Sequence, residues 1–102
     1  MTYNKQFAAQ ILQFNAQWNE TDKFTIADNI EKYLYEKFPE CKDSYNVKME
    51  KLIEITKSKK DTIYSWLNRG RENVKFPLLK LCMLAVALDV NVEKFLEVEN
   101  DN

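Results

Sequence analysis

Residues 52–70 read LIEITKSKKDTIYSWLNRG, and this stretch decides the fold. Two helical patterns meet within it: one ends near Lys57, the other covers residues 59–69, and two or three residues separate them. In the second pattern the apolar residues recur at helical spacing and share one face, namely Ile63, Trp66 and Leu67. We therefore expect two short helices joined by a tight turn, with Trp66 in the core.

The ends of the second helix carry their own signals. Ser58 precedes it and Asp61 follows three residues later, which is the spacing of a capping box. Gly70 stands where a helix needs a residue that can take a positive φ as its C-cap. Two helices joined in this way form a helix-turn-helix, whose second helix can lie in the major groove of DNA.

Apolar periodicity on both sides of this motif predicts further helices. With one Gly and two Pro in 102 residues, turn-forming residues are scarce, so we expect an all-α fold of five to six helices plus an extra N-terminal helix. The expected helices cover residues 3–19, 24–38, 47–57, 59–69, 77–88 and 92–98, and residues 40–46 are expected to form a loop. The face of the first helix consists of Phe7, Ile11, Phe14 and Trp18.

Local signals place several of these helix ends. Thr25 with Asp28 three residues later resembles a capping box, and Pro39 ends the apolar stripe that follows. Pro77 suits a first helical position, because its missing amide costs nothing there. Asn91 can cap the last short helix.

The helix over residues 77–88 is apolar on nearly every side. One stripe contains Leu78, Leu81, Cys82, Ala85 and Leu88, and the other contains Leu79, Met83 and Val86. Because two stripes cannot both face one small core, we expect the second to be covered at least in part by the N-terminal helix or by a second subunit.

Length and composition are those of one globular domain, with 45% apolar and 30% charged residues in 102. The longest apolar run, residues 81–88, is too short to cross a bilayer and no signal peptide is evident, so we expect a cytoplasmic protein. We divide the chain into an N-terminal accessory helix (1–22), a helix-turn-helix domain (23–98) and an acidic tail (99–102).

The usual parts of an enzyme are missing from the sequence. Histidine is absent, and the single glycine excludes a Gly-rich phosphate loop, so we expect no active site, metal or cofactor. The two cysteines are expected to be free thiols, with Cys41 exposed in a loop and Cys82 buried among apolar residues.

Charge is unevenly distributed along the chain. Residues 41–80 carry ten Lys and Arg against five Asp and Glu, a balance of +5, although the whole chain has a net charge of −1. A basic middle segment between acidic ends indicates a polyanionic partner, or else a solvated lysine-rich face.

The order of these elements resembles the lambda-repressor/Cro-type (XRE-like) family of helix-turn-helix DNA-binding domains. The resemblance is carried by Leu52-Ile53, by TIYSWLNRG at residues 62–70, by Pro77, Leu81 and Ala85, and by LDVNVEKFL at residues 88–96. It implies a sequence-specific regulator of transcription, a repressor of phage or mobile-element type, that binds double-stranded DNA as a homodimer. It implies no small-molecule substrate.

Three positions depart from the family pattern. Where the family usually has an alanine, a glycine in the turn and a phosphate-holding glutamine, this chain has Ile53, Lys57 and Met49. Lys48, one residue before Met49, is the cation that we expect to replace the glutamine at the same phosphate.

The candidate contacts follow from the exposed face of the helix over residues 59–69. The expected base contacts are Lys59, Lys60, Asp61, Tyr64, Ser65 and Asn68. The expected phosphate contacts are Lys48, Arg69, Arg71 and Lys75. The structural alternative is that Asp61 only caps the helix and that the lysines are solvated charges.

A second function remains open at this point. The chain could be a protein-binding helix-turn-helix module, such as an antirepressor, a nuclease inhibitor or an accessory factor of a DNA-processing complex. The missing glutamine favours this alternative, and the +5 segment favours DNA.

Overall fold

Helices account for most of what the computed structural model describes, which is residues 5–68 and 74–98, apart from the side chains of Gln6 and Phe7. The elements are α1 (Lys5–Glu20), α2 (Lys23–Lys37), α3 (Glu40–Asp43), α4 (Tyr45–Thr56), α5 (Lys60–Leu67), α6 (Leu78–Leu88) and the 3₁₀-helix η1 (Val92–Leu96). No strand occurs in these two described ranges. The all-α prediction is therefore confirmed.

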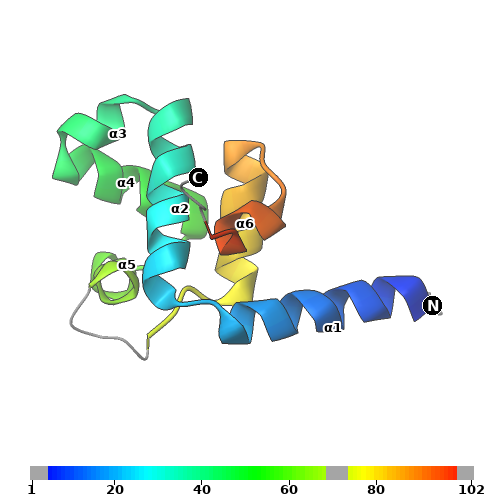
Figure 1. Cartoon of the computed structure of the whole chain (residues 1–102). Helices are drawn as coiled ribbons and strands as arrows, with labels where there is room; N and C mark the ends of the chain where they lie inside the picture. The colour runs from blue at the N-terminus through cyan, green and yellow to red at the C-terminus, as the bar shows by residue number, and fades with distance from the viewer. Residues whose placement is uncertain (1–4, 69–73, 99–102) are drawn as a thin grey trace.

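The core lies around α2, which contacts α3, α5, α6 and η1 (Figure 1). Helix α5 buries Ile63 and Trp66 of its predicted apolar stripe, whereas α6 buries Leu81, Leu84, Ala85 and Leu88 and leaves Cys82 of its predicted stripe exposed. The fully buried side chains include Ile30, Leu34, Leu52, Ile63, Phe76, Leu81, Leu84 and Phe95. Trp66 is 5% exposed and its ring lies 4.8 Å from that of Phe76, which confirms its predicted place in the core.

The loop predicted over residues 40–46 is wrong. Glu40–Asp43 form the short helix α3, which packs on α4 and buries Cys41. The side chain of Ser44 then accepts a hydrogen bond from the Val47 amide at 3.3 Å, so α4 begins at Tyr45. The buried Cys41 anchors α3, and the side chain of Ser44 caps α4, so this polar stretch contains the end of one helix and the start of the next.

Two predicted N-caps are also wrong. The side chain of Asp22, not of Thr25, accepts from the Phe24 amide at 3.1 Å, so α2 starts earlier than its capping-box pattern indicated. Ser58 does not cap α5, because its Oγ donates to the Thr56 carbonyl at 3.3 Å and Lys59 takes the N-cap position. The backbone geometry of the turn, which no local pattern reports, directs Ser58 back toward α4.

Downstream, α6 begins at Leu78, one residue after the predicted start at Pro77. The last helix is a 3₁₀-helix that ends at Leu96, with Asn91 at its N-cap but no side-chain hydrogen bond. Gly70 and the predicted acidic tail lie outside the described residues.

Both cysteines are free thiols, as predicted, but both predicted exposures are wrong. Cys41 is 1% exposed, and burial together with the charge of Glu40 raises the pKa of its thiol, which keeps it protonated at neutral pH. Cys82 is exposed, because the core-facing stripe of α6 consists of Leu81, Leu84, Ala85 and Leu88.

The C-terminal half of α1 packs on the domain. Phe14 and Trp18 contact the core, and the Trp18 Nε1 donates to the Phe76 carbonyl at 2.9 Å. The N-terminal half extends away from the body (Figure 1), and Ile11, which we predicted on the apolar face, is 52% exposed. Among the described helices, none has the length and apolar character that crossing a membrane requires.

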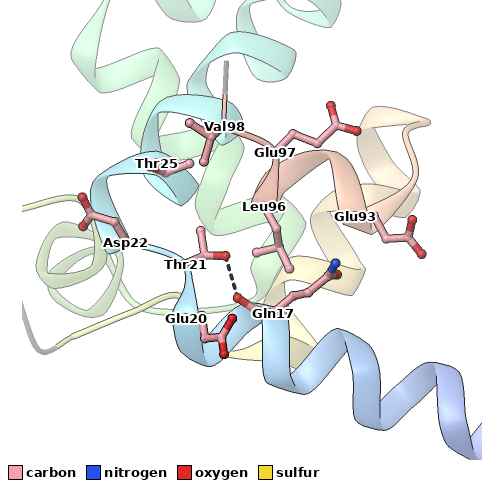
Figure 2. Close-up of a pocket in the computed structure, with 9 residues that line it drawn as sticks. All are labelled: Gln17, Glu20, Thr21, Asp22, Thr25, Glu93, Leu96, Glu97 and Val98. Atoms are coloured by element: carbon pink, nitrogen blue, oxygen red, sulfur yellow. Dashed lines mark hydrogen bonds between the residues drawn. The ribbon is translucent and has the colours of Figure 1, made fainter. Parts of the chain in front are cut away.

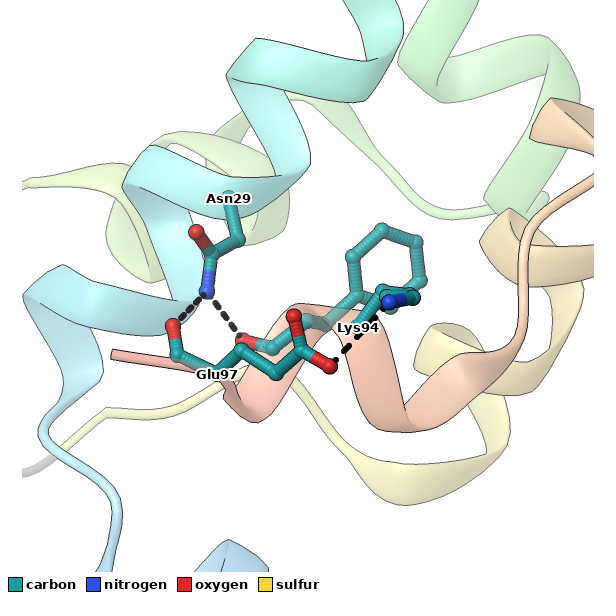
Figure 3. A network of polar contacts seen from close by, with 4 residues as sticks. Asn29, Lys94 and Glu97 are labelled. Carbon is teal, nitrogen blue, oxygen red and sulfur yellow. Dashed lines mark hydrogen bonds and ion pairs between the residues drawn. The ribbon is translucent and has the colours of Figure 1, made fainter. Parts of the chain in front are cut away.

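A buried amide fixes η1 against α2 (Figure 3). The Asn29 Nδ2 donates to the carbonyls of Phe95 at 2.9 Å and of Glu97 at 2.7 Å, and the Asn29 side chain is buried. An exposed ion pair joins Lys94 to Glu97 at 3.3 Å. The Asn29 contacts hold the end of the domain that lies across α2 from α5 (Figure 1).

Replacing Lys57 by glycine is expected to stabilise the fold by about 1 kcal/mol, because a residue with a Cβ is strained in the left-handed region. Lys57 has φ 57° and ψ 32° at the end of α4. It is also the position where the resembled family has glycine. Denaturant unfolding measures the change. Lys57→Ala keeps the Cβ and should not stabilise; equal stabilisation by both variants would attribute the effect to the lost charge.

Candidate nucleic-acid interface

The predicted helix-turn-helix is formed by α4 and α5, joined by Lys57, Ser58 and Lys59. The buried Thr56 closes α4: its Oγ1 donates to the Leu52 carbonyl at 2.7 Å. The Lys80 Nζ donates to the Thr56 carbonyl at 2.7 Å, which ties the end of α4 to α6. The Lys80 bond satisfies a carbonyl at the C-terminus of α4, and both bonds hold the turn in place.

The two sides of α5 differ sharply in exposure. Ile63 and Trp66 are buried, whereas Tyr64 is 51% exposed. Of the six predicted base contacts, four are exposed, namely Lys59, Lys60, Asp61 and Tyr64. Together with Tyr45 these residues form what we call the outer face of the helix-turn-helix.

Ser65 and Asn68 are only half-buried members of the predicted set. The Ser65 Oγ donates to the Thr62 carbonyl at 2.7 Å, which directs the hydroxyl along the helix. Asn68 is the C-cap of α5, and its backbone N–H donates to the Tyr64 carbonyl. These two residues therefore lie at the edge of the outer face.

Tyr45 is a member of the outer face that the sequence analysis missed. Its ring is 52% exposed and the Lys60 Nζ lies 5.9 Å from its centroid. The available signal in the sequence was the position of Tyr45 directly after Ser44, a residue type that often caps a helix. The contact places an aromatic ring of α4 beside a lysine of α5.

Lys23 is a second residue that the sequence analysis missed. Its Nζ donates to the carbonyls of Ser65 at 2.9 Å and Asn68 at 2.8 Å, and its side chain is 2% exposed. A cation at a helix C-terminus is favourable for both hydrogen bonding and the helix dipole. Lys23 thus fixes the end of α5 from the first turn of α2. No feature of the sequence distinguishes it from a surface lysine.

Lys48, predicted to contact phosphate, is partly buried and paired within the chain. Its Nζ lies 3.3 Å from the Glu31 carboxylate and 5.6 Å from the Tyr35 ring centroid, and its side chain is 12% exposed. Burial alone lowers the pKa of Lys48, but the hydrogen bond with Tyr35 and the charge of Glu31 outweigh it and raise that pKa. The ammonium is charged at neutral pH and already has partners.

Lys75 is also engaged within the chain. Its Nζ donates to the carbonyls of Trp18 at 2.9 Å and Asn19 at 3.0 Å, near the end of α1, and lies 5.1 Å from the Trp18 ring centroid. The structure does not bring Lys48 and Lys75 together with the outer face as a phosphate-binding row. Arg69 and Arg71 lie outside the described residues.

A pocket of about 510 Å³ lies away from the outer face, where α1, α2 and η1 meet (Figure 2). Its charged side chains are all acidic, namely Glu20, Asp22, Glu93 and Glu97. Within the part of the chain that the structure describes, no group of three or more Cys, Asp or Glu residues is arranged to hold a metal. These acidic residues belong to α1 and η1 or flank α2 and η1, and none belongs to α5.

Comparison with known proteins gives no further guide. No family model matches the sequence, and no characterised protein or solved structure is significantly similar to the chain. A proposal for its function therefore depends on its own residues, on their geometry and on the resemblance of its motif.

Proposed function

We propose that the chain binds double-stranded DNA by placing α5 in the major groove. The observation that supports this proposal is that buried contacts fix the inner side and the C-terminal end of α5, while its outer face is exposed. Ile63 and Trp66 anchor its inner side and Lys23 closes its end, while Lys60 and Tyr64 lie outward one turn apart. Sites on rigid elements place recognising side chains most accurately.

The dimensions and chemistry of α5 suit this role. A helix with its side chains is about 10–12 Å across, and the major groove is about 12 Å wide. Lys59 and Lys60 can donate to guanine O6 and N7, Asp61 can accept from cytosine N4, and the Tyr64 hydroxyl can bond a base edge or a phosphate. Asp61 also lies in the first turn of α5, where a negative charge favours the helix dipole.

The form of the DNA site follows from the length of α5. Its eight residues span about 12 Å, or three to four base pairs, which is too few to define a genomic site. Two copies on half-sites about 34 Å apart would supply the missing specificity. In line with the family resemblance, the protein acts in this proposal as a transcriptional repressor of phage or mobile-element type.

Lys60→Ala and Tyr64→Ala are each expected to weaken specific DNA binding by about 1–3 kcal/mol, the usual value of one base contact. A binding sequence is first selected from a random duplex library with the wild-type protein. Fluorescence anisotropy on that duplex then gives the dissociation constant of each variant. Thermal unfolding should change little, because both side chains are exposed.

Lys94→Ala is the matched control, since it removes one positive charge from η1, away from α5. Its affinity should stay within about twofold of wild type at moderate salt, where distant charges are screened. Equal losses in Lys60→Ala and Lys94→Ala would indicate a general charge effect and contradict base reading by α5.

Protein binding is the second candidate function, and the internal partners of Lys48 and Lys75 favour it. Two of the predicted phosphate contacts already bind groups within the chain, so fewer cations are available to a DNA backbone. If the folded wild-type protein retains no duplex even at about 50 mM salt, where phosphate binding is strongest, the DNA proposal is wrong and this alternative takes its place.

A further inference from the structure

The outward side of α6 is an apolar surface that nothing in the described chain covers. Leu79 is 67% exposed, Val86 is 83% exposed and Cys82 lies between them, also exposed. Their spacing of three and four residues places all three on one face of the helix, as in the seam of a coiled coil. We expected at least one of Leu79, Met83 and Val86 to be covered by the N-terminal helix or by a second subunit; within the chain Met83 is half-buried, whereas Leu79 and Val86 are exposed.

This surface, which we call the α6 seam, carries no charge of its own. Lys80 is the one charged residue of α6, and its Nζ is bound to the Thr56 carbonyl of α4. Two such helices can therefore approach each other without like charges meeting. A face that is apolar and without charge is self-complementary, which is what a two-fold interface requires.

A neighbouring apolar cleft extends the seam toward α1. The cleft lies between α1 and the side of α6 that carries Cys82, and its apolar lining is Ile11, Phe14, Leu78, Cys82 and Val92. On α1, Leu12 directly follows the cleft-lining Ile11 and is 70% exposed. The exposed apolar surface thus continues from α6 onto the N-terminal helix.

We infer that the occupant of this surface is a second copy of the chain, with the two α6 helices packed antiparallel about a two-fold axis near Cys82. Cys82 is the midpoint of the seam, so in an antiparallel pair it meets its own counterpart. The same arrangement places Asp89, at the C-terminal end of each α6, beside the N-terminal end of the other α6, where the helix dipole favours a negative charge.

The projecting half of α1 can supply the contact area that α6 alone is too short to provide for a stable dimer. Specific dimers bury about 800 Å² on each partner, whereas a helix of eleven residues is only about 16 Å long. Because α1 lies beside the N-terminal end of α6, its projecting half reaches the C-terminal end of the partner's α6 in the antiparallel pair. There an open pocket is lined by Ala85, Val86, Asp89, Val90 and Asn91, and in this arrangement Leu12 packs on its two valines.

The experiment measures molar mass in solution without DNA. The wild-type chain should have twice its 12.2 kDa at micromolar concentration. Val86→Lys should raise the dimer dissociation constant on the order of 100-fold or more, because each new ammonium group is then buried in the apolar seam beside the N-terminal half of the partner's α6, where the helix dipole disfavours a positive charge. Val98→Lys is the matched control, since Val98 is 69% exposed but lies beyond η1, and it should remain dimeric.

Crosslinking tests the dimer with the wild-type chain and therefore does not depend on whether a variant folds. A short bis-maleimide should join two wild-type chains through Cys82, while the buried Cys41 stays unmodified and Cys82→Ser gives no product. A wild-type mass of 12.2 kDa, a dimer that survives Val86→Lys, or a dimer that Cys82 does not crosslink would each overturn the inference.

This interface and the proposed DNA contact can fail independently. The mass and crosslinking experiments contain no DNA, and the residues that they change lie on α6 or beyond η1, not on α5. If the chain is monomeric and still binds duplex through Lys60 and Tyr64, the dimer inference is wrong and the DNA-binding proposal stands. A dimer without DNA binding would mean the reverse.

Discussion

Trp66→Ala should destabilise the protein by about 3–5 kcal/mol, the usual cost of emptying the volume of a large aromatic side chain in a core. Trp66 is 5% exposed and packs on Phe76, whose side chain is 1% exposed. Small domains are stable by only about 5–15 kcal/mol, so this loss is a large fraction of the total. Urea unfolding followed by circular dichroism measures it.

The neighbouring Tyr64→Ala is the control for Trp66→Ala. Both residues are aromatic and lie on the same helix, but Tyr64 is 51% exposed and should cost less than about 1 kcal/mol. DNA binding should show the opposite order when measured below the unfolding range of the tryptophan variant. Similar unfolding energies for the two variants would mean that α5 does not have the inner and outer sides assigned to it.

Lys23→Met should cost about 2–3 kcal/mol, because two carbonyls at the end of α5 lose their hydrogen bonds to a charged donor. Methionine keeps most of the apolar stem and so isolates the role of the ammonium group. The Nζ of Lys23 reaches the carbonyls of Ser65 and Asn68. If α5 binds DNA, this variant should also bind it more weakly, although Lys23 itself is buried.

Lys75→Met provides the matched comparison for Lys23→Met. Lys75 also donates to two carbonyls near the end of a helix, those of Trp18 and Asn19, but its side chain is only half-buried. Water can replace these bonds, so the loss should be no more than about 1 kcal/mol. An equal cost for the two variants would show that burial does not set the value of the Lys23 contacts.

The sequence alone determined the helical class, the position of the helix-turn-helix and the inward side of α5. These features depend on the period of apolar residues and on the scarcity of Gly and Pro, which act within one or two helical turns. Ile63 and Trp66 face the core because their spacing admits one common face, and the surrounding helices provide the core that receives them.

Only the tertiary structure decided which polar side chains face the solvent. Lys23, Lys48 and Lys75 look like surface lysines in the sequence, yet each contacts groups 13 to 57 positions away along the chain. The exposures of Cys41 and Cys82 were likewise set by the packing of α3 on α4 and by the side that α6 turns to the core. The spacing of residues along the sequence determines which side of its own helix a residue lies on. The burial and the partners of that residue depend on how distant helices pack, because they arise only when those helices meet.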